Sequence, residues 1–393
     1  MPSNVRVAHV SSAHPASDPR IHLREAASLS AAGYDVTVIA VHSDTELPET
    51  GVRVTELPVR PRLQRATIGS LMAVWAAIKS RAAIVHLHDP ELSWAVVPLR
   101  LVGKAVIFDA HEDLPVQMLE KHYLRRGTRG LALLASWLVV KMAGRANHVI
   151  AATEAISRRF PERKVSVVRN YPRIRLNDAE AVPVLDRPRH VGYIGALSAL
   201  RGALEMVDAF GATSFPENWD VVLAGSMSPD SLLTELVGRP GWARVNYKGV
   251  LSPDEARDLL NECRVGLVLF QRSRAHVDAL PTKMFEYLAA GLPIIASDFP
   301  LWRSIIEPLD CGTLVDETSP DAIAAAVSRY ASDPDLLARH GANALKAAHG
   351  ELNWATQEPN LLSAYAGIVE SRRSKGPRSL NRGNGKADKH DQT

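Results

Sequence analysis

Cysteine, aromatic residues and long apolar runs are scarce in this chain, and each scarcity excludes a class of protein. The 393 residues include 2 cysteines, and 6% of the residues are aromatic. The cysteines, Cys263 and Cys311, are too few for a disulfide framework, so we expect a reducing compartment. The longest uncharged apolar stretch, Gly130–Val140, is too short to span a bilayer, and the first residues lack the pattern of a signal peptide. We therefore expect a cytoplasmic protein.

Metal-ligand patterns and a strongly basic composition are also missing. No group of His and Cys residues has metal-site spacing, and no Ser-His-Asp or Cys-His set is indicated by spacing. The net charge is +3 with 23% charged residues, which is not basic enough for a nucleic-acid-binding protein. We expect no metal, no cofactor and no nucleic-acid partner.

Positive charge is nevertheless concentrated at the end of the chain. Residues 371–393 contain seven Lys or Arg, two Asp and almost no apolar side chains. This composition predicts a disordered basic tail. Weak attraction to anionic lipid or nucleic acid, and a solvated terminus without a function, both remain open.

Short apolar runs alternate with helical patterns along almost the whole chain. The alternation predicts an α/β protein with parallel sheets covered by helices on both faces. The expected strands are Val5–Val10, Asp35–Val41, Ile84–His88, Ala105–Asp109, His148–Ala151 and Val165–Val168, then His190–Ile194, Asp220–Ala224, Val245–Lys248, Val265–Phe270, Pro293–Ser297 and Thr313–Val315.

The alternation breaks in a proline-containing stretch, which divides the chain. We predict a first Rossmann-like domain at 1–172, a linker at 173–189 and a second Rossmann-like domain at 190–351. A C-terminal helix at 352–370 is expected to pack back towards the first domain, followed by the tail at 371–393. Two doubly wound domains of this kind face each other across a cleft at the carboxyl ends of their strands, where such folds bind ligands.

The most informative stretch runs from Asp278 to Pro293. Thr282 can cap a helix there and Gly291 can end it. The free N–H groups of a helix start bind anions, and Lys283 adds a positive charge that opposes the helix dipole. Glu286 follows about one turn later, where its carboxylate can accept hydrogen bonds from sugar hydroxyls. The alternative is an ordinary amphipathic helix with a surface lysine.

A glycine-containing turn follows the first strand of the second half. Residues 195–202 do not spell Gly-x-Gly-x-x-Gly, so a classical dinucleotide fingerprint is absent. Gly195 permits close approach of the backbone to a ligand, and Arg201 can present a planar donor fork to a diphosphate. A plain strand–helix turn with a solvated arginine remains the alternative.

Polar residues also follow three strands of the first half, where a doubly wound fold places its ligands. The candidates are His111 within Asp109–Asp113, His88 with Asp89, and Asp18 with Arg20 in the loop after the first strand. Helix caps, a satisfied loop histidine and a flexible loop are the alternative interpretations.

Arginines flank apolar stretches of the first half and form a basic edge. They are Arg60, Arg62, Arg65, Arg125, Arg126 and Arg129. This edge can touch a membrane surface, or it can be the basic flank of core helices.

Taken together, these motifs resemble the retaining glycosyltransferases of family 4, which have the GT-B fold, from Val5 to about Glu370. Asp278 and Glu286 resemble the family's paired acids, with Asp in place of the first Glu. Gly195 and Arg201 resemble its glycine turn, with Ala196 where the first basic residue usually stands. His111 resembles the histidine at the cleft edge of the first domain. Asp18-Pro-Arg20, in place of the usual Gly-Gly, resembles a bacterial subgroup that also carries His-Asp-Pro-Glu and Asp-x-His-Glu-Asp.

The resemblance implies a role for each residue. The ribose of a nucleotide diphosphate sugar would be bound by Glu286, the diphosphate by Arg201 and the N–H groups near Thr282 and Lys283, and the donor sugar by Asp278. His111 would face the anomeric centre. The remaining donor-side candidates are Gly195, Gly249, Val250, Leu251, Leu280 and Pro281, and the acceptor-side candidates are Asp18, Arg20, His88 and Asp89.

The implied function is sugar transfer with retention to a glycan, a lipid-linked or a small-molecule acceptor, in bacterial polysaccharide or glycoconjugate synthesis. Catalysis would be mainly electrostatic, without a metal, and the enzyme would be cytoplasmic with possible peripheral contact to the membrane. Two alternatives remain open. One is a nucleotide-sugar epimerase on the same fold, and the other is a non-catalytic scaffold with the fold of a glycosyltransferase.

Overall fold

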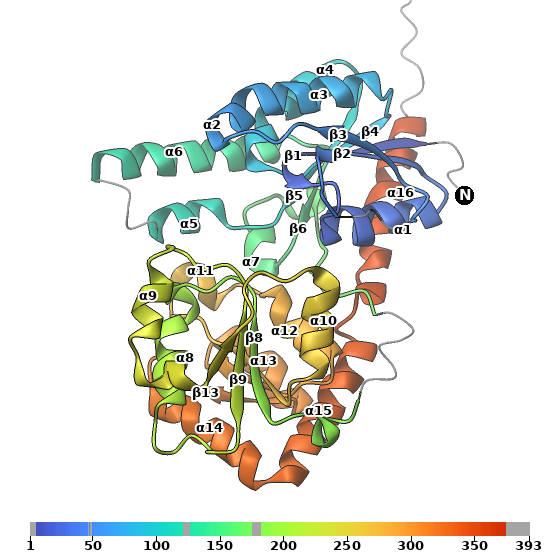
Figure 1. Cartoon of the computed structure of the whole chain (residues 1–393). Helices are drawn as coiled ribbons and strands as arrows, with labels where there is room; N and C mark the ends of the chain where they lie inside the picture. The colour runs from blue at the N-terminus through green and yellow to red at the C-terminus, as the bar shows by residue number, and fades with distance from the viewer. Residues whose placement is uncertain (1–4, 46, 48, 121–125, 175–181, 375–393) are drawn as a thin grey trace, which may run out of the picture.

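The computed structural model describes residues 5–45, 47, 49–120, 126–174 and 182–374, and it contains two parallel sheets with helices on both faces (Figure 1). The first is a 7-stranded sheet of order β3-β2-β1-β4-β5-β6-β7, and the second is a 6-stranded sheet of order β10-β9-β8-β11-β12-β13. In both sheets the strand order reverses beside the first strand, β1 or β8. This doubly wound α/β architecture confirms the predicted fold class.

The elements of the first half have the following bounds. Its strands are β1 (Arg6–Pro15), β2 (Asp35–Val41), β3 (Arg53–Leu57), β4 (Ile84–Leu87), β5 (Ala105–Ala110), β6 (His148–Ala151) and β7 (Val165–Val167). Its helices are η1 (Pro19–Ala26), α1 (Ala27–Ala31), α2 (Arg62–Gln64), η2 (Arg65–Gly69), α3 (Ser70–Lys79), η3 (Pro90–Ala95), α4 (Val96–Leu101), α5 (Leu114–Glu120), α6 (Arg126–Ala143), α7 (Glu154–Ser157) and η4 (Glu162–Lys164).

The second half and the C-terminal helix follow. The strands are β8 (His190–Ile194), β9 (Asp220–Ala224), β10 (Val245–Tyr247), β11 (Val265–Val268), β12 (Ile294–Ser297) and β13 (Gly312–Val315). The helices are η6 (Val184–Asp186), η7 (Ala199–Arg201), α8 (Ala203–Phe210), α9 (Leu232–Val237), η8 (Pro240–Arg244), α10 (Pro253–Asn261), α11 (Arg274–Val277), α12 (Thr282–Ala289), α13 (Pro300–Leu309), α14 (Pro320–Ser332), α15 (Pro334–His349), η9 (Trp354–Thr356) and α16 (Glu358–Ser374).

Each sheet buries apolar side chains on both of its faces. One face of the first sheet packs against α3, α4 and α6, and the opposite face packs against η1, α1 and α16. The second sheet packs against α8 and α14 on one side and against α12, α13 and α15 on the other. These helices explain why the central strands are nearly continuous apolar runs rather than alternating patterns.

The last helix returns to the first half of the molecule. Figure 1 shows α16, drawn in red, running from the second half along the first sheet. Leu361 and Tyr365 of this helix are buried in the core of the first half, and the Trp354 indole donates a 2.8 Å hydrogen bond to Ser28 Oγ. The first half therefore completes its core with residues from the end of the chain.

Some sequence-based predictions fall on residues outside those described. They are part of the linker (175–181), Arg125, the side chain of Arg126 and the tail from residue 375. Within the described part of the chain, none of the helices combines the length and the apolar character that crossing a membrane requires.

Candidate functional site

The start of α12 presents backbone N–H groups that no side chain caps. The helix begins at Thr282, its N-cap residue is Pro281, and no side-chain hydrogen bond caps it. The prediction that Thr282 caps the helix is wrong, because Thr282 already lies inside the first turn and the cap position holds a proline. The predicted end of the helix is confirmed, since Gly291 has φ +68 directly after the last turn. The uncapped start leaves donors free for an anion.

Lys283 lies beside this helix start and has no hydrogen-bonding partner for its ammonium group. Its Nζ is 3.5 Å from the centre of the Tyr193 ring, and its side chain is buried. Burial lowers the pKa of Lys283 well below its ordinary value, and nearby Arg201 lowers it further while Glu286 opposes the shift. A buried cation without an anionic partner suits a site that receives negative charge from a ligand.

Gly195 is the residue that lets Lys283 occupy this position. A Cβ atom at residue 195 would lie 3.0 Å from Lys283 Nζ, and the φ of Gly195 is +135. Arg201 stands on the same turn, where its guanidinium donates to the Ala196 carbonyl at 3.1 Å. The structure thus brings Gly195, Arg201 and Lys283 together at the carboxyl end of β8.

The two acids of the paired motif lie on either side of this helix start. Asp278 is exposed at the end of α11, a helix that contacts α5 of the first half. Trp302 of α13 holds the following residue, because its indole donates to the Ala279 carbonyl at 2.8 Å. The Glu286 side chain is exposed. Desolvation by the surrounding protein raises its pKa, and Arg24 of the first half is the strongest of the charges that oppose this shift.

The remaining donor-side candidates occupy loops near the helix start. Gly249 has φ +70, and its carbonyl accepts a 2.6 Å hydrogen bond from Gly225 N, which joins the loops after β9 and β10. Val250 is 75% exposed, whereas Leu251 packs against the sheet. Leu280 and Pro281 are partly buried in the segment that leads into α12.

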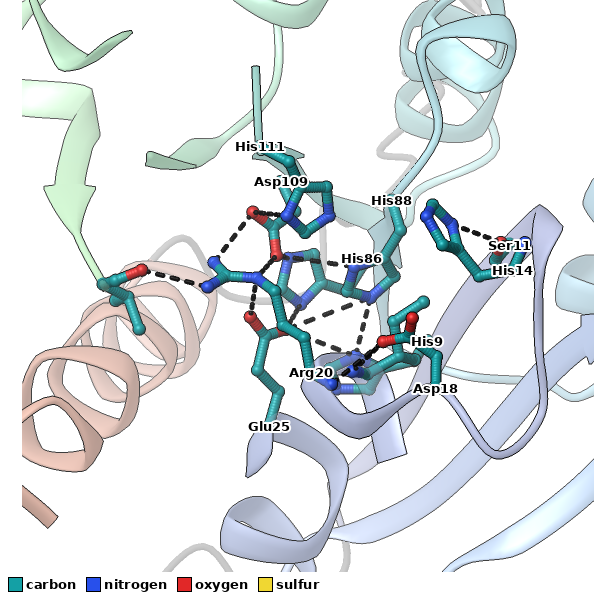
Figure 2. A network of polar contacts seen from close by, with 12 residues as sticks. His9, Ser11, His14, Asp18, Arg20, Glu25, His86, His88, Asp109 and His111 are labelled. Carbon is teal, nitrogen blue, oxygen red and sulfur yellow. Dashed lines mark hydrogen bonds and ion pairs between the residues drawn. The ribbon is translucent and has the colours of Figure 1, made fainter. Parts of the chain in front are cut away.

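A buried network of charged and aromatic side chains lies in the first half of the molecule, around β4 and β5 (Figure 2). Arg20 donates to both oxygens of Asp109, with Nε 3.1 Å from Oδ2 and Nη2 3.0 Å from Oδ1. His88 Nδ1 is 3.4 Å from Asp109 Oδ2, and the same carboxylate is 3.6 Å from His111 Nδ1. The pKa of Asp109 falls well below its ordinary value, because Arg20 and His111 outweigh the effect of burial.

The predicted acceptor-side residues are mostly engaged within the protein. Asp18 caps η1 by accepting from Arg20 N at 2.9 Å and Ile21 N at 3.0 Å. Asp89 is fully buried and fixes the loop after β1, accepting from Ser11 Oγ at 2.9 Å and from His14 Nδ1 at 2.8 Å. This contact raises the pKa of His14 to about 9. Arg20, His88 and Asp89 therefore support the neighbouring loops through contacts within the protein.

His111 is a predicted residue of the first half that faces a cavity. It lines a cavity of about 150 Å³ together with His14, Asp113, Val140 and Phe160. Burial lowers the pKa of His111 to about 4, although Asp109 opposes the shift. Its imidazole is therefore neutral at physiological pH, and both polar and apolar residues line the cavity beside it.

Two glycosyltransferase family models match consecutive parts of the chain. The model described as glycosyl transferase 4-like domain matches residues 20–172, and the model described as glycosyl transferases group 1 matches residues 177–347. The chain is a GT-B glycosyltransferase. Comparison with curated protein sequences finds no match.

Solved structures of low sequence identity share the fold of this GT-B glycosyltransferase. Sucrose-phosphate synthase from Thermosynechococcus elongatus is 19% identical with a TM-score of 0.71, and the alignment covers 93% of this chain and 99% of that one. Anabaena HepE in complex with UDP-glucose is 14% identical with a TM-score of 0.70, covering 92% and 99%. WaaG, a glycosyltransferase involved in lipopolysaccharide biosynthesis, is 14% identical with a TM-score of 0.66, covering 91% and 99%.

Several site residues of this glycosyltransferase were not singled out by sequence reasoning. Arg24 of the first half interacts electrostatically with Glu286 of the second half, although no sequence motif pairs the two residues. Glu25 and Tyr365 belong to the buried network, and neither lies in a recognisable motif. An acid or a tyrosine inside a helical pattern gives no sequence signal until the helix is packed.

Proposed function

We propose that the protein is a retaining glycosyltransferase whose donor is a nucleotide diphosphate sugar. The observation that carries this proposal is the convergence of Lys283, Arg201 and the uncapped start of α12 on one point of the cleft. Two cations and free N–H groups at one point favour a ligand with several negative charges. The UDP-glucose complex of HepE supports the same class of donor.

Within this proposal each cleft residue has a separate task. Glu286 accepts hydrogen bonds from the ribose hydroxyls, and the loop formed by Gly249, Val250 and Leu251 flanks the base. Asp278 holds the donor sugar near the contact between α11 and α5, with Leu280 and Pro281 beside the diphosphate. His111 faces the anomeric centre from the first half.

The chemistry is electrostatic in this proposal. Negative charge develops on the leaving diphosphate as the glycosidic bond breaks, and Arg201, Lys283 and the N–H groups of α12 stabilise it. The two cations take the place that a metal ion holds in other transferases, so no metal is proposed at the donor site. A neutral His111 can accept a hydrogen bond from the sugar without adding charge to the acceptor side.

The acceptor is proposed to be a glycan or lipid-linked acceptor of polysaccharide or glycoconjugate synthesis. Helix α6 exposes a stripe of large apolar side chains at helical spacing, and α3 exposes another. They are Leu131, Leu134 and Leu138 on α6, and Leu71, Trp75 and Ile78 on α3. Arg62 and Arg129 are exposed near these stripes, which supports reversible contact of the first half with an anionic membrane.

A panel of nucleotide sugars incubated with the purified protein tests the donor class. We expect one donor to be hydrolysed slowly or transferred, and NMR of the first-formed product to show the donor's anomeric configuration. An inverted product would overturn retention. Conversion of the donor to its epimer would favour the epimerase alternative, and absence of binding to every donor would favour the scaffold alternative.

A further inference from the structure

Four buried side chains converge at one point in the first half of the molecule (Figure 2). His9 comes from β1, Glu25 from η1, and His86 with His88 from the end of β4. Glu25 Oε2 lies 3.8 Å from His9 Nδ1, 3.6 Å from His86 Nδ1 and 4.0 Å from His88 Nε2. One ligand atom from each residue lies within 4.8 Å of the other three, and all four side chains are buried. A tetrahedral ion with bonds of about 2.0–2.1 Å has ligand–ligand edges of roughly 3.3–3.4 Å, so the separations from Glu25 exceed those edges by a few tenths of an ångström.

The outer ring nitrogen of each histidine faces an oxygen atom. His9 Nε2 is 3.3 Å from the Tyr365 hydroxyl, and His88 Nδ1 is 3.4 Å from Asp109 Oδ2. His86 Nε2 is 3.8 Å from the same Asp109 oxygen. Histidines that bind metals donate their second N–H to such carboxylate and hydroxyl partners, which fixes the tautomer. The inner nitrogen of His86, Nδ1, also lies 2.9 Å from the Tyr365 hydroxyl. A metal ion at this point would take the lone pair of that nitrogen in place of the hydroxyl.

The rings of His9 and His88 are in direct contact through one nitrogen of each. His9 Nδ1 and His88 Nε2 are 2.9 Å apart. If the outer nitrogens of both rings carry protons, two lone pairs face each other at this distance. A hydrogen bond, with a proton on one of the two nitrogens, also satisfies this contact, and a cation bound by both rings would replace that proton.

The Glu25 carboxylate supplies an independent indication that a cation can bind at this point. Its carboxylate is fully buried, and neither oxygen has a hydrogen-bonding partner, although Arg20 Nε lies 3.1 Å from Oε1. A carboxylate in this position lacks a charge partner on the side that faces the three histidines.

We propose that His9, Glu25, His86 and His88 bind one divalent transition-metal ion of the zinc class. A set of three imidazoles and one carboxylate suits Zn²⁺ or Co²⁺ and disfavours Mg²⁺ and Ca²⁺, which prefer oxygen ligands. Four protein ligands close the coordination shell, so the ion has a structural task. It ties β1, β4 and η1 together and fixes His88 and Asp109 behind His111.

This site departs from the sequence-based expectation that the protein binds no metal. It is independent of the proposed donor site, since none of its ligands belongs to the second half. The cavity beside His111 offers a route for the ion, because His88 and Asp109 line it.

Metal binding by the full chain is the direct test, after removal of any polyhistidine tag and dialysis against a chelator. We expect calorimetry with ZnCl₂ to give one site per chain, and CoCl₂ to give the intense visible absorption of a tetrahedral nitrogen-ligated ion. The melting temperature should rise with added Zn²⁺, because the ion binds the folded state. A folded wild-type protein that binds neither ion would overturn the proposal and leave the cluster as a proton-sharing network.

Two variants locate the ion. Glu25→Gln and His9→Gln should each weaken Zn²⁺ binding at least tenfold, whereas His148→Gln on β6 of the same sheet should bind as the wild type does. Circular dichroism verifies that each variant is folded. If Glu25→Gln is folded and binds Zn²⁺ unchanged, the ion sits elsewhere on the surface and the assignment fails.

Discussion

At the scale of single residues, Lys283 is expected to make binding of a nucleoside diphosphate depend on pH. Its pKa is lowered in the free protein, whereas a diphosphate beside it favours the charged form. Below the lowered pKa the lysine is already charged, so affinity for a nucleoside diphosphate is constant. Above that pKa binding takes up a proton, and affinity falls as the pH rises.

Calorimetry of nucleoside diphosphate binding in buffers of different ionisation enthalpy measures this proton uptake. We expect uptake above the lowered pKa for the wild-type protein and none for Lys283→Met. Equal uptake in both proteins would assign the linkage to another group.

Glu286 is expected to be essential for donor use. Glu286→Ala removes a charged acceptor for the ribose, which costs about 1.5–3 kcal/mol or more, equivalent to roughly a 10- to 150-fold loss of affinity. The measurement is turnover with the donor found in the panel, and exposed Glu262→Ala is the matched control. Near-normal turnover of a folded Glu286→Ala protein would disprove the assignment.

Arg201 is expected to contribute affinity through charge. Arg201→Ala should weaken nucleoside diphosphate binding and flatten its dependence on salt, because an ion pair at a partly exposed site is screened. Calorimetry at two salt concentrations measures both effects. Unchanged affinity at both concentrations would mean that Arg201 serves only its contact with Ala196.

At the scale of elements, α10 offers the clearest local determinant of stability. Ser252 accepts from Glu255 N while the Glu255 carboxylate accepts from Ser252 N, which is a complete capping box. Ser252→Ala should cost about 0.5–2 kcal/mol of stability. Urea denaturation measures the change, and Ser332→Ala at the end of α14 should be close to neutral. An equal loss in both variants would show that the cap is not the cause.

Elements with strong local signals could be predicted, and elements defined by packing could not. The apolar runs of the central strands and the Gly291 helix end gave the correct structure from sequence alone. The short edge strand β3 was missed because its side chains are mostly exposed and carry no apolar run. The sequence does not indicate helix α13, because Pro300 begins it and Pro308 lies inside it, and prolines commonly indicate loops.

The candidate site also combines residues that could be predicted from the sequence with residues that could not. The donor-side residues stand in contiguous motifs, so spacing alone grouped Asp278, Lys283 and Glu286. The buried network draws its members from positions as far apart as His9 and Tyr365, and only the folded sheet and α16 bring them together. Metal-ligand spacing was therefore absent from the sequence although the ligand atoms are neighbours in space.

At the scale of the whole molecule, we predict reversible binding to anionic vesicles through the first half. Each basic residue near an anionic surface contributes about 1 kcal/mol, which salt screens. Deletion of residues 371–393 should leave the binding intact, and Leu131→Ser with Leu138→Ser should weaken it. Vesicle co-sedimentation measures this, with Val237→Ser on α9 of the second half as the control.

The outcomes of this experiment separate the two basic regions. If the tail-deleted protein stays in the supernatant at low salt, the membrane-edge proposal fails, and any binding by the full chain belongs to the tail. Equal losses from the α6 and α9 substitutions would also contradict a contact specific to the first half.

The return of α16 makes the second half an insertion within the first. The chain enters the second sheet at His190, leaves it before Trp354, and then supplies Leu361 and Tyr365 to the core it left earlier. A fragment that stops at residue 172 would expose the face those residues cover and would aggregate. A chimaera that exchanges donor specificity with a relative must therefore be cut twice, once on each side of the insert, and keep α16 with its own first half.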